Sequence, residues 1–249
     1  MKNAELRRTV KGARRAFLFV HGIIGTPDQF AYLIDVIPEN VTLWNIRLDG
    51  HGGSVRDFAK TSMKKWEAQF EREIEQLSER HDEIYIVAHS MGTLFAIRQA
   101  IKNPKIAGLF FLQVPMTVSL KPRMVGSAVR ILLDRVAPDD LETVAAQRCY
   151  GIERSLNLFG YIGWLPRYFE LFAKIREVKR ELALLKTPCV AYQSKRDELV
   201  SVRSAKILRR FSSAEVFELE KSGHFYYEEN DLAFLRSELQ KFARGREEV

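Results

Sequence analysis

The stretch Ile84-Tyr-Ile-Val-Ala-His-Ser90-Met-Gly92 decides how this chain folds. Residues 84–88 are apolar or aromatic throughout, which is typical of a strand in a parallel sheet that is covered on both faces. Apolar residues then recur with helical spacing from Met91 to about Ile101. The sequence therefore places Ser90 in a sharp turn between a buried strand and the start of a helix.

A serine in such a turn is typical of a nucleophile elbow, in which the hydroxyl stands at the end of the sheet. The turn strains the serine backbone, so the residues two positions before and after it must be small for strand and helix to approach each other. Ala88 and Gly92 meet this requirement, although the usual G-x-S-x-G pattern has glycine at the first position. The alternative is a serine that caps an ordinary helix, a position that serine favours.

Apolar runs alternate with helical patterns on both sides of this stretch. The predicted strands are residues 16–20, 41–48, 84–88, 106–114, 189–193 and 215–220. The predicted helices are residues 29–37, 62–80, 91–101, 202–211 and 231–242. This alternation predicts an α/β fold, with one mainly parallel sheet and helices on both faces.

Residues 116–182 interrupt the alternation. They contain no convincing strand, and prolines and glycines break their apolar pattern into about three or four short helices. We interpret this segment as an inserted helical cap. Residues 1–115 and 183–249 then form the core domain that carries the cap.

A serine hydroxyl is a weak nucleophile near neutral pH, so it needs a general base that a carboxylate orients. At a nucleophile elbow the partners follow the serine in the order acid and then histidine, each after a strand. Asp197 follows the predicted strand 189–193, and His224 follows the predicted strand 215–220. We therefore predict that Ser90, Asp197 and His224 are the catalytic residues.

Each partner also has a simpler interpretation. Asp197 suits the cap of the following helix, and His224 suits an ordinary loop. Three residues of the right types in the right order, each just after a strand, make coincidence improbable. Glu198, next to Asp197, is the alternative carboxylate.

Negative charge that develops on an attacked carbonyl oxygen needs main-chain N–H donors. Met91, the residue after the nucleophile, is predicted to supply one. The loop His21-Gly-Ile-Ile-Gly-Thr-Pro27 is predicted to supply the other from Ile23, because Gly22 allows close approach of the backbone. His21 is expected to shape this loop by hydrogen bonding, since His224 already fills the position of the base.

Composition excludes several other classes of protein. Among 249 residues, 46% are hydrophobic and 29% are charged, which is typical of a folded globular chain. The net charge of +7 comes from scattered basic residues with no stripe of interleaved aromatic residues, so we expect no binding of nucleic acid. The longest apolar run, residues 106–112, is far shorter than the ~20 residues of a membrane helix, so we expect no stable membrane insertion.

Three further patterns carry no separate site. Cys149 and Cys189 are interpreted as packing residues, and so few cysteines, with no signal-peptide pattern, predict a cytoplasmic location. No pair of histidines has the spacing of a metal site, so no metal is indicated. The segment Asp49-Gly-His-Gly-Gly-Ser54 lacks the phosphate-binding glycine patterns and is interpreted as a turn at the rim of the site.

Taken together, these motifs resemble those of the α/β-hydrolase superfamily, and more narrowly those of its small carboxylesterase and monoacylglycerol-lipase-like group. The matching segments are HGIIGTP at 21–27, DGHGGS at 49–54, AHSMG at 88–92, RDELVSVRSA at 196–205 and SGHF at 222–225. The resemblance implies ester hydrolysis through an acyl-enzyme on Ser90 and implies no cofactor. Compared with larger relatives, the antiparallel N-terminal strands are expected to be absent or reduced to one near Thr9 and Val10.

The expected partner is a small-molecule ester with a short- to medium-chain acyl group. Apolar cap residues either pack a small core or line an acyl pocket; they are Leu132, Leu133, Phe159, Tyr161, Ile162, Trp164, Leu165, Phe169, Leu171 and Phe172. The same catalytic residues would also suit a peptidase, a thioesterase or an acyltransferase. A non-catalytic binding module on the same fold is the alternative from a different class, and the oligomeric state stays open.

Overall fold

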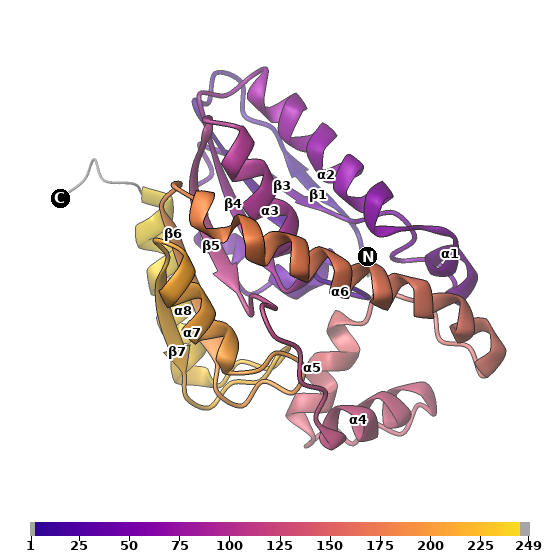
Figure 1. Cartoon of the computed structure of the whole chain (residues 1–249). Coiled ribbons are helices and arrows are strands. Elements are labelled where there is room, and N and C mark those ends of the chain that lie inside the picture. Colours follow the sequence, from indigo (N-terminus) through magenta and orange to yellow (C-terminus); the bar gives the residue numbers. More distant parts are fainter. Residues whose placement is uncertain (1–2, 245–249) are drawn as a thin grey trace.

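A central sheet organises the computed structural model, which describes residues 3–244 (Figure 1). Within these residues the strands lie in the order β1-β3-β2-β4-β5-β6-β7. β1 is antiparallel to β3, and all other neighbours are parallel. The mainly parallel sheet predicted from the sequence is therefore confirmed. The strands are β1 Leu6–Arg8, β2 Arg15–Val20, β3 Thr42–Ile46, β4 Glu83–His89, β5 Ile106–Leu112, β6 Cys189–Ser194 and β7 Glu215–Leu219.

The two faces of the sheet carry two separate apolar cores, because successive side chains of a strand point to opposite sides. In β2, Leu18 and Val20 belong to one core, whereas Phe17 and Phe19 belong to the other. All four side chains are fully buried. Strands such as β2 carry continuous apolar runs because helices cover both faces of the sheet.

The first core is covered by α2 (Met63–Ser78), α3 (Met91–Lys102), α6 (Leu165–Glu181) and α7 (Arg203–Phe211). The second is covered by α8 (Glu229–Arg244) and by two short 3₁₀ turns. Figure 1 shows α6 crossing in front of α3 and α2, with α4 and α5 beyond one end of the sheet. No helix between residues 3 and 244 is long and apolar enough to cross a membrane.

Two local predictions near the N-terminus are wrong. The antiparallel strand is Leu6–Arg8 rather than residues 9–10, because the N–H of Val10 donates to the Thr42 hydroxyl instead of to a strand partner. Residues 29–37 form no α-helix but two 3₁₀ turns, η1 (Pro27–Phe30) and η2 (Ile34–Val36). Branched side chains at three of the last four positions of this segment disfavour a longer helix.

The short helix α1 (Val55–Lys60) was not predicted from the sequence. Ser54 and Asp57 form a capping box at its start, in which each side chain accepts a hydrogen bond from the other residue's main chain. This S-x-x-D pattern was the signal that could have revealed the helix. The preceding glycines do form a turn, in which Gly50 and Gly52 have φ values of 75° and 81°.

The segment between β5 and β6 is helical, as predicted. It contains α4 (Pro122–Leu132), α5 (Leu141–Cys149), the 3₁₀ helix η3 (Leu158–Trp164), α6 and the 3₁₀ turn η4 (Leu182–Leu184). Lys174 and Arg98 both pair with Glu67, at 2.8 and 2.7 Å, so ion pairs join α6 and α3 to α2. Because α6 also contributes to the first core, it belongs to the layer that covers the sheet.

Substitution of Gly92 tests the contact between α3 and β2. A Cβ atom at this position would lie 2.6 Å from the carbonyl oxygen of Val20 and 2.8 Å from that of His21. We expect Gly92→Ala to lower the free energy of unfolding by about 1–3 kcal/mol, measured by urea denaturation, because main-chain oxygens cannot rotate away.

Gly126→Ala is the matched control in α4. There the new Cβ would meet only the Arg130 guanidinium, at 3.6 Å. Since alanine is the better helix former, we expect stability to be unchanged or raised by up to about 1 kcal/mol. Equal stability of Gly92→Ala and the unsubstituted protein would contradict the close contact.

Candidate active site

Ser90 occupies a strained turn between β4 and α3. Its φ and ψ are 50° and −122°, a conformation that residues other than glycine rarely adopt. Its side chain makes no capping hydrogen bond to α3, which argues against the interpretation as an ordinary helix cap. The neighbours explain how the turn is tolerated: Ala88 is a small, fully buried residue of β4, and Gly92 leaves room for the main chain of β2.

Asp197 and His224 come together in the loops that follow β6 and β7. The Nδ1 atom of His224 lies 2.8 Å from Oδ2 of Asp197, and both side chains are almost completely buried. The other carboxylate oxygen of Asp197 accepts hydrogen bonds from the N–H groups of Leu199 and Val200, both at 2.7 Å. These contacts fix the orientation of the carboxylate.

The structure brings His224 next to the elbow. The Nε2 atom of His89, the residue before Ser90, lies 3.0 Å from the carbonyl oxygen of His224. The rings of His89 and His224 pack edge to face with their centroids 4.6 Å apart. Three residues that are far apart in the sequence, Ser90, Asp197 and His224, therefore lie at the same end of the sheet.

Glu198 is the alternative carboxylate. Among the residues that the structure describes, no hydrogen bond joins its side chain to the imidazole ring of His224. Its Oε2 atom accepts a hydrogen bond of 3.0 Å from the main-chain N–H of His224. Burial raises the pKa of this carboxyl group, and the nearby charge of Asp197 raises it further. The two adjacent acids thus hold different parts of the same histidine.

The loop after β2 passes directly over Ser90. A Cβ atom on Gly22 would lie 2.9 Å from the Cβ atom of Ser90, so only glycine permits this approach. Ile24 has a φ of 54°, which is strained for a β-branched residue and turns the loop back on itself. Ile23 lies between these two residues, and Met91 is the first residue of α3.

His21 shapes this loop, as the sequence suggested. Its Nδ1 atom donates to the carbonyl oxygen of Gly22 at 2.9 Å, and its Nε2 atom accepts from the N–H of Leu48 at 3.1 Å. This pattern requires the neutral imidazole, and burial lowers the pKa of His21 to about 4. His51 packs against it with the ring centroids 4.7 Å apart.

Sequence reasoning missed several buried polar residues around the site. Gln29 lies 2.7 Å from Nδ1 of His89, and Gln113 holds the main-chain N–H of Ser194 at 2.9 Å. Gln113 also has a φ of 55° where β5 ends. For Gln113, a polar residue directly after an apolar strand was the available signal, because such a side chain needs a buried partner. Gln29 lies in η1, where no such signal was present in the sequence.

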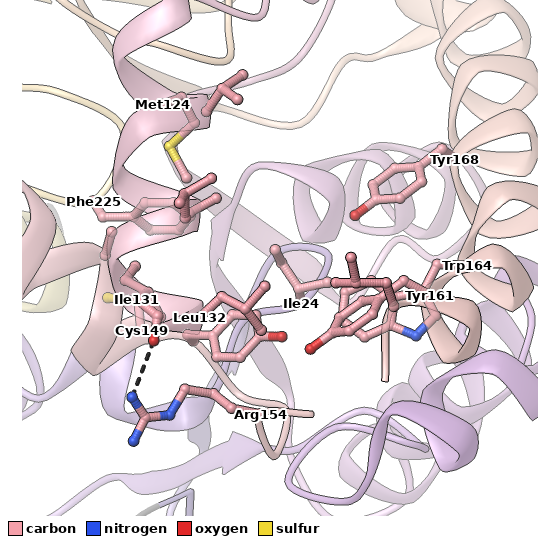
Figure 2. A pocket seen from close by; sticks show the side chains of 16 residues that line it. Ile24, Met124, Ile131, Leu132, Cys149, Arg154, Tyr161, Trp164, Tyr168 and Phe225 are labelled. Carbon is pink, nitrogen blue, oxygen red and sulfur yellow. Dashed lines mark hydrogen bonds between the residues drawn. The ribbon is translucent and has the colours of Figure 1, made fainter. Parts of the chain in front are cut away.

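An apolar cavity of about 380 Å³ opens beside the site (Figure 2). Ile24, which belongs to the loop over Ser90, and Phe225, which follows His224, form part of the cavity wall. Figure 2 shows Tyr161, Trp164 and Tyr168 along one side and side chains of α4 and α5 along the other. Arg154 and three tyrosines supply most of the polar groups; the remaining lining residues include Met124, Ile131, Leu132, Ala146 and Cys149.

The apolar cap residues named from the sequence differ in their surroundings, and Trp164 both lines the cavity and belongs to the first core. Leu132, Tyr161 and Trp164 line the cavity, which agrees with a role in a pocket. Leu171 and Trp164 are buried in the first core. The expectation of packing or lining is wrong for the exposed members, which are Leu133, Phe159, Ile162, Leu165, Phe169 and Phe172.

The cysteines behave as packing residues. Cys149 and Cys189 are buried and unpaired, and burial raises the pKa of the Cys149 thiol to about 12. Within residues 3–244, no group of three or more histidine, cysteine or acidic side chains is arranged to hold a metal ion.

Comparison with known proteins places this geometry in a family. Residues 17–237 match the model of the alpha/beta hydrolase family, and the chain therefore belongs to that family. It is 28% identical over 175 residues to the thermostable monoacylglycerol lipase of Bacillus sp. (strain H-257). That match covers 69% of this chain and 56% of the relative, so the chain spans just over half of the length of this relative.

Solved structures show the same fold. A metagenome-derived structure from a study of the lipolytic enzymes LipS and LipT has a TM-score of 0.72 and 20% identity, and covers 97% of both chains. The monoacylglycerol lipase of Paleococcus ferrophilus has a TM-score of 0.69 and 18% identity, and the match covers 98% of this chain and 99% of that one. Both confirm the α/β-hydrolase fold predicted from the sequence.

The neutral, buried His21 generates a prediction about stability and pH. The unfolded chain binds a proton at this imidazole below pH 6.5, whereas the native protein binds it only below about pH 4. Stability is therefore fully present above pH 6.5 and falls as the pH drops through this window, by up to roughly 3 kcal/mol for one such group.

Urea denaturation between pH 7 and pH 4 measures this effect against His21→Gln, which has no titratable ring. We expect the unsubstituted protein to lose stability more steeply than the variant, by up to about 1.4 kcal/mol per pH unit. Parallel stability curves for the two proteins would show that His21 is not held neutral.

Proposed function

We propose that this chain is a serine hydrolase that cleaves carboxylic esters of short- to medium-chain acyl groups through an acyl-enzyme on Ser90. The observation that carries the proposal is the 2.8 Å contact between buried Asp197 and His224 beside a serine with a φ of 50°. A nucleophile, a base and an orienting acid at one end of the sheet are the parts that acyl transfer requires.

The proposed reaction begins with the tautomer of His224. Its Nδ1–H donates to Asp197, which leaves Nε2 free to accept the proton of Ser90 as Oγ attacks the ester carbonyl carbon. The tetrahedral intermediate collapses, the C–O bond to the alcohol breaks, and the alcohol leaves with the proton from His224. Water then attacks the acyl-enzyme, His224 takes the proton of the water, and the acid is released with Ser90 restored.

The oxyanion hole is assigned to the N–H groups of Ile23 and Met91. Met91 opens α3, where the first N–H groups have no partner within the helix and the helix dipole is positive. Gly22 brings the loop that carries Ile23 into contact with Ser90. Donors in fixed positions of this kind stabilise the negative charge without reorganisation during the reaction.

The acyl group is assigned to the apolar cavity of about 380 Å³ between α4, α5 and η3. Its wall begins at Ile24 and Phe225, next to the proposed oxyanion hole and base. We keep the division into a core of residues 1–115 and 183–249 and an inserted cap of residues 116–182 as part of this proposal. The substrate would enter between the cap and the site.

An ester is preferred over the substrate of a peptidase, thioesterase or acyltransferase because the cavity is mostly apolar and the similar Bacillus protein is a monoacylglycerol lipase. A non-catalytic binding module would have no need for the contact between Asp197 and His224. Two unpaired cysteines support a cytoplasmic location for the protein.

Substitutions in the triad test the proposal with p-nitrophenyl butyrate. We expect Ser90→Ala to abolish hydrolysis above the background rate. Asp197→Asn should retain the fold while kcat falls on the order of 10⁴-fold, because the amide favours the wrong tautomer of His224. Equal rates for Ser90→Ala and the unsubstituted protein would remove the enzymatic proposal, and near-normal turnover of Asp197→Asn would assign the acid to Glu198.

Narrowing the cavity tests the position of the acyl group. Ala146 lines the cavity from α5, so we expect Ala146→Phe to lower kcat/KM for p-nitrophenyl octanoate relative to the acetate by about 10-fold or more. Ala145→Phe on the same helix is the matched control, since Ala145 does not line the cavity. The same change in the octanoate-to-acetate ratio for both variants would place the acyl group elsewhere.

A further inference from the structure

The main chain of His224 is held on both sides by buried side chains. The carboxylate of Glu198 accepts from its N–H, and the imidazole of His89 donates to its carbonyl oxygen, each at 3.0 Å. These two residues are the sequence neighbours of Asp197 and Ser90. The loop that carries the proposed base is thus connected directly to the loops that carry the proposed acid and nucleophile.

Burial of a charged carboxylate is unfavourable unless partners compensate the charge, so the contacts of Glu198 are informative. Its side chain is only 7% exposed, and its charge is met by the Arg123 guanidinium at 3.4 Å. Arg123 lies on α4 and also donates to the main-chain carbonyl of Arg196. A Cβ atom on Gly223 would lie 2.8 Å from Oε2 of Glu198, so the carboxylate fits closely against the main chain that precedes the base.

His89 is fixed in one tautomer by its two partners. A main-chain carbonyl only accepts, so the Nε2 atom of His89 carries the proton that binds His224. The Nδ1 atom then accepts from the side-chain amide of Gln29 at 2.7 Å. Burial holds the pKa of His89 well below its usual range, which keeps the ring neutral.

We propose that Glu198 is a positioning residue that holds the main chain of His224 from its N–H side, opposite His89, so that the imidazole meets both Asp197 and Ser90. The inference rests on the proposed function and extends it. One hydrogen bond from Asp197 to the ring fixes a single point of the side chain, and the ring can still swing if the main chain moves. Displacement of a reacting group by about 1 Å can reduce the rate on the order of 100-fold.

This role differs from that of a triad acid in what it demands of the side chain. A positioning residue needs an acceptor for the N–H of His224, which the amide oxygen of glutamine supplies. A triad acid needs a negative charge, which glutamine lacks. Comparison of Glu198→Gln with Glu198→Leu therefore separates the two roles.

The experiment measures kcat and KM with p-nitrophenyl butyrate and the midpoint of thermal unfolding. We expect Glu198→Gln to keep kcat within about threefold, and Glu198→Leu to lower kcat about 10- to 100-fold with KM within about twofold. Glu220→Gln and Glu220→Leu are the matched controls, because Glu220 lies in the same region but is exposed and pairs with Lys195. Both controls should have unchanged kcat.

Each other outcome overturns the inference. Unchanged kcat in Glu198→Leu would make Glu198 a purely structural residue, and raised KM with unchanged kcat would make it a binding residue. Loss of activity in Glu198→Gln as large as in Asp197→Asn would make its charge part of the chemistry. Failure of the unsubstituted protein to hydrolyse any ester would instead contradict the proposed function, and is recognised before any variant is compared.

Gly223→Ala provides a second variant in case Glu198→Leu does not fold. Its methyl group would displace the carboxylate of Glu198 from the N–H of His224 while leaving the carboxylate in the chain. We expect kcat to fall at least about fivefold with KM unchanged. Normal kcat in a folded Gly223→Ala variant would also overturn the inference.

Discussion

The close approach of α3 to the end of β2 is the constraint on which the rest of the site depends. Gly92 lies against the carbonyl oxygens of Val20 and His21, and this contact leaves the chain no relaxed route from β4 into α3. Ser90 absorbs the sharp change of direction with a φ of 50°. Strain of this kind persists only where the surrounding structure fixes both ends, and here β4 is a central strand and α3 is almost completely buried.

The interior around this turn contains several polar side chains that are deeply buried. The side chains of His21, His89, Asp197, Glu198 and His224 are all at least nine-tenths buried. An unpartnered polar group at such depth costs about 1–3 kcal/mol, so each of these must find a defined partner. Several partners are main-chain groups of distant segments, and the network therefore fixes the loops relative to one another as well as the side chains.

The segment between β5 and β6 has two parts with different attachments. α6 is held to α2 and α3 by the charges of Lys174 and Arg98 and by apolar packing, so this part of the inserted segment packs directly on the core domain. α4 and α5 instead form walls of the apolar cavity. Arg123 connects α4 to the loop of Glu198, which gives the wall of the cavity a direct contact with the residues around the base.

Local sequence determined much of the fold and the identity of the candidate residues. Continuous apolar runs such as residues 84–88 can be satisfied only inside a covered sheet. Ser90 follows that run, and Asp197 and His224 each follow a later strand. Propensity failed at residues 29–37, where branched side chains favoured two 3₁₀ turns, and it missed α1, whose capping box is visible in the sequence.

Only the tertiary structure decided how the neighbouring residues divide their tasks. Asp197 and Glu198 are adjacent acids with no difference in local pattern, yet one contacts the imidazole of His224 and the other its main-chain N–H. In the sequence, nothing distinguishes His89 from the other residues at the end of a buried strand. Its role becomes visible only in the fold, where the loop after β7 places the main chain of His224 beside it. The physical reason is that hydrogen bonds act over about 3 Å, and the partners here are separated by 26 to 135 positions along the chain, so no local pattern can specify them.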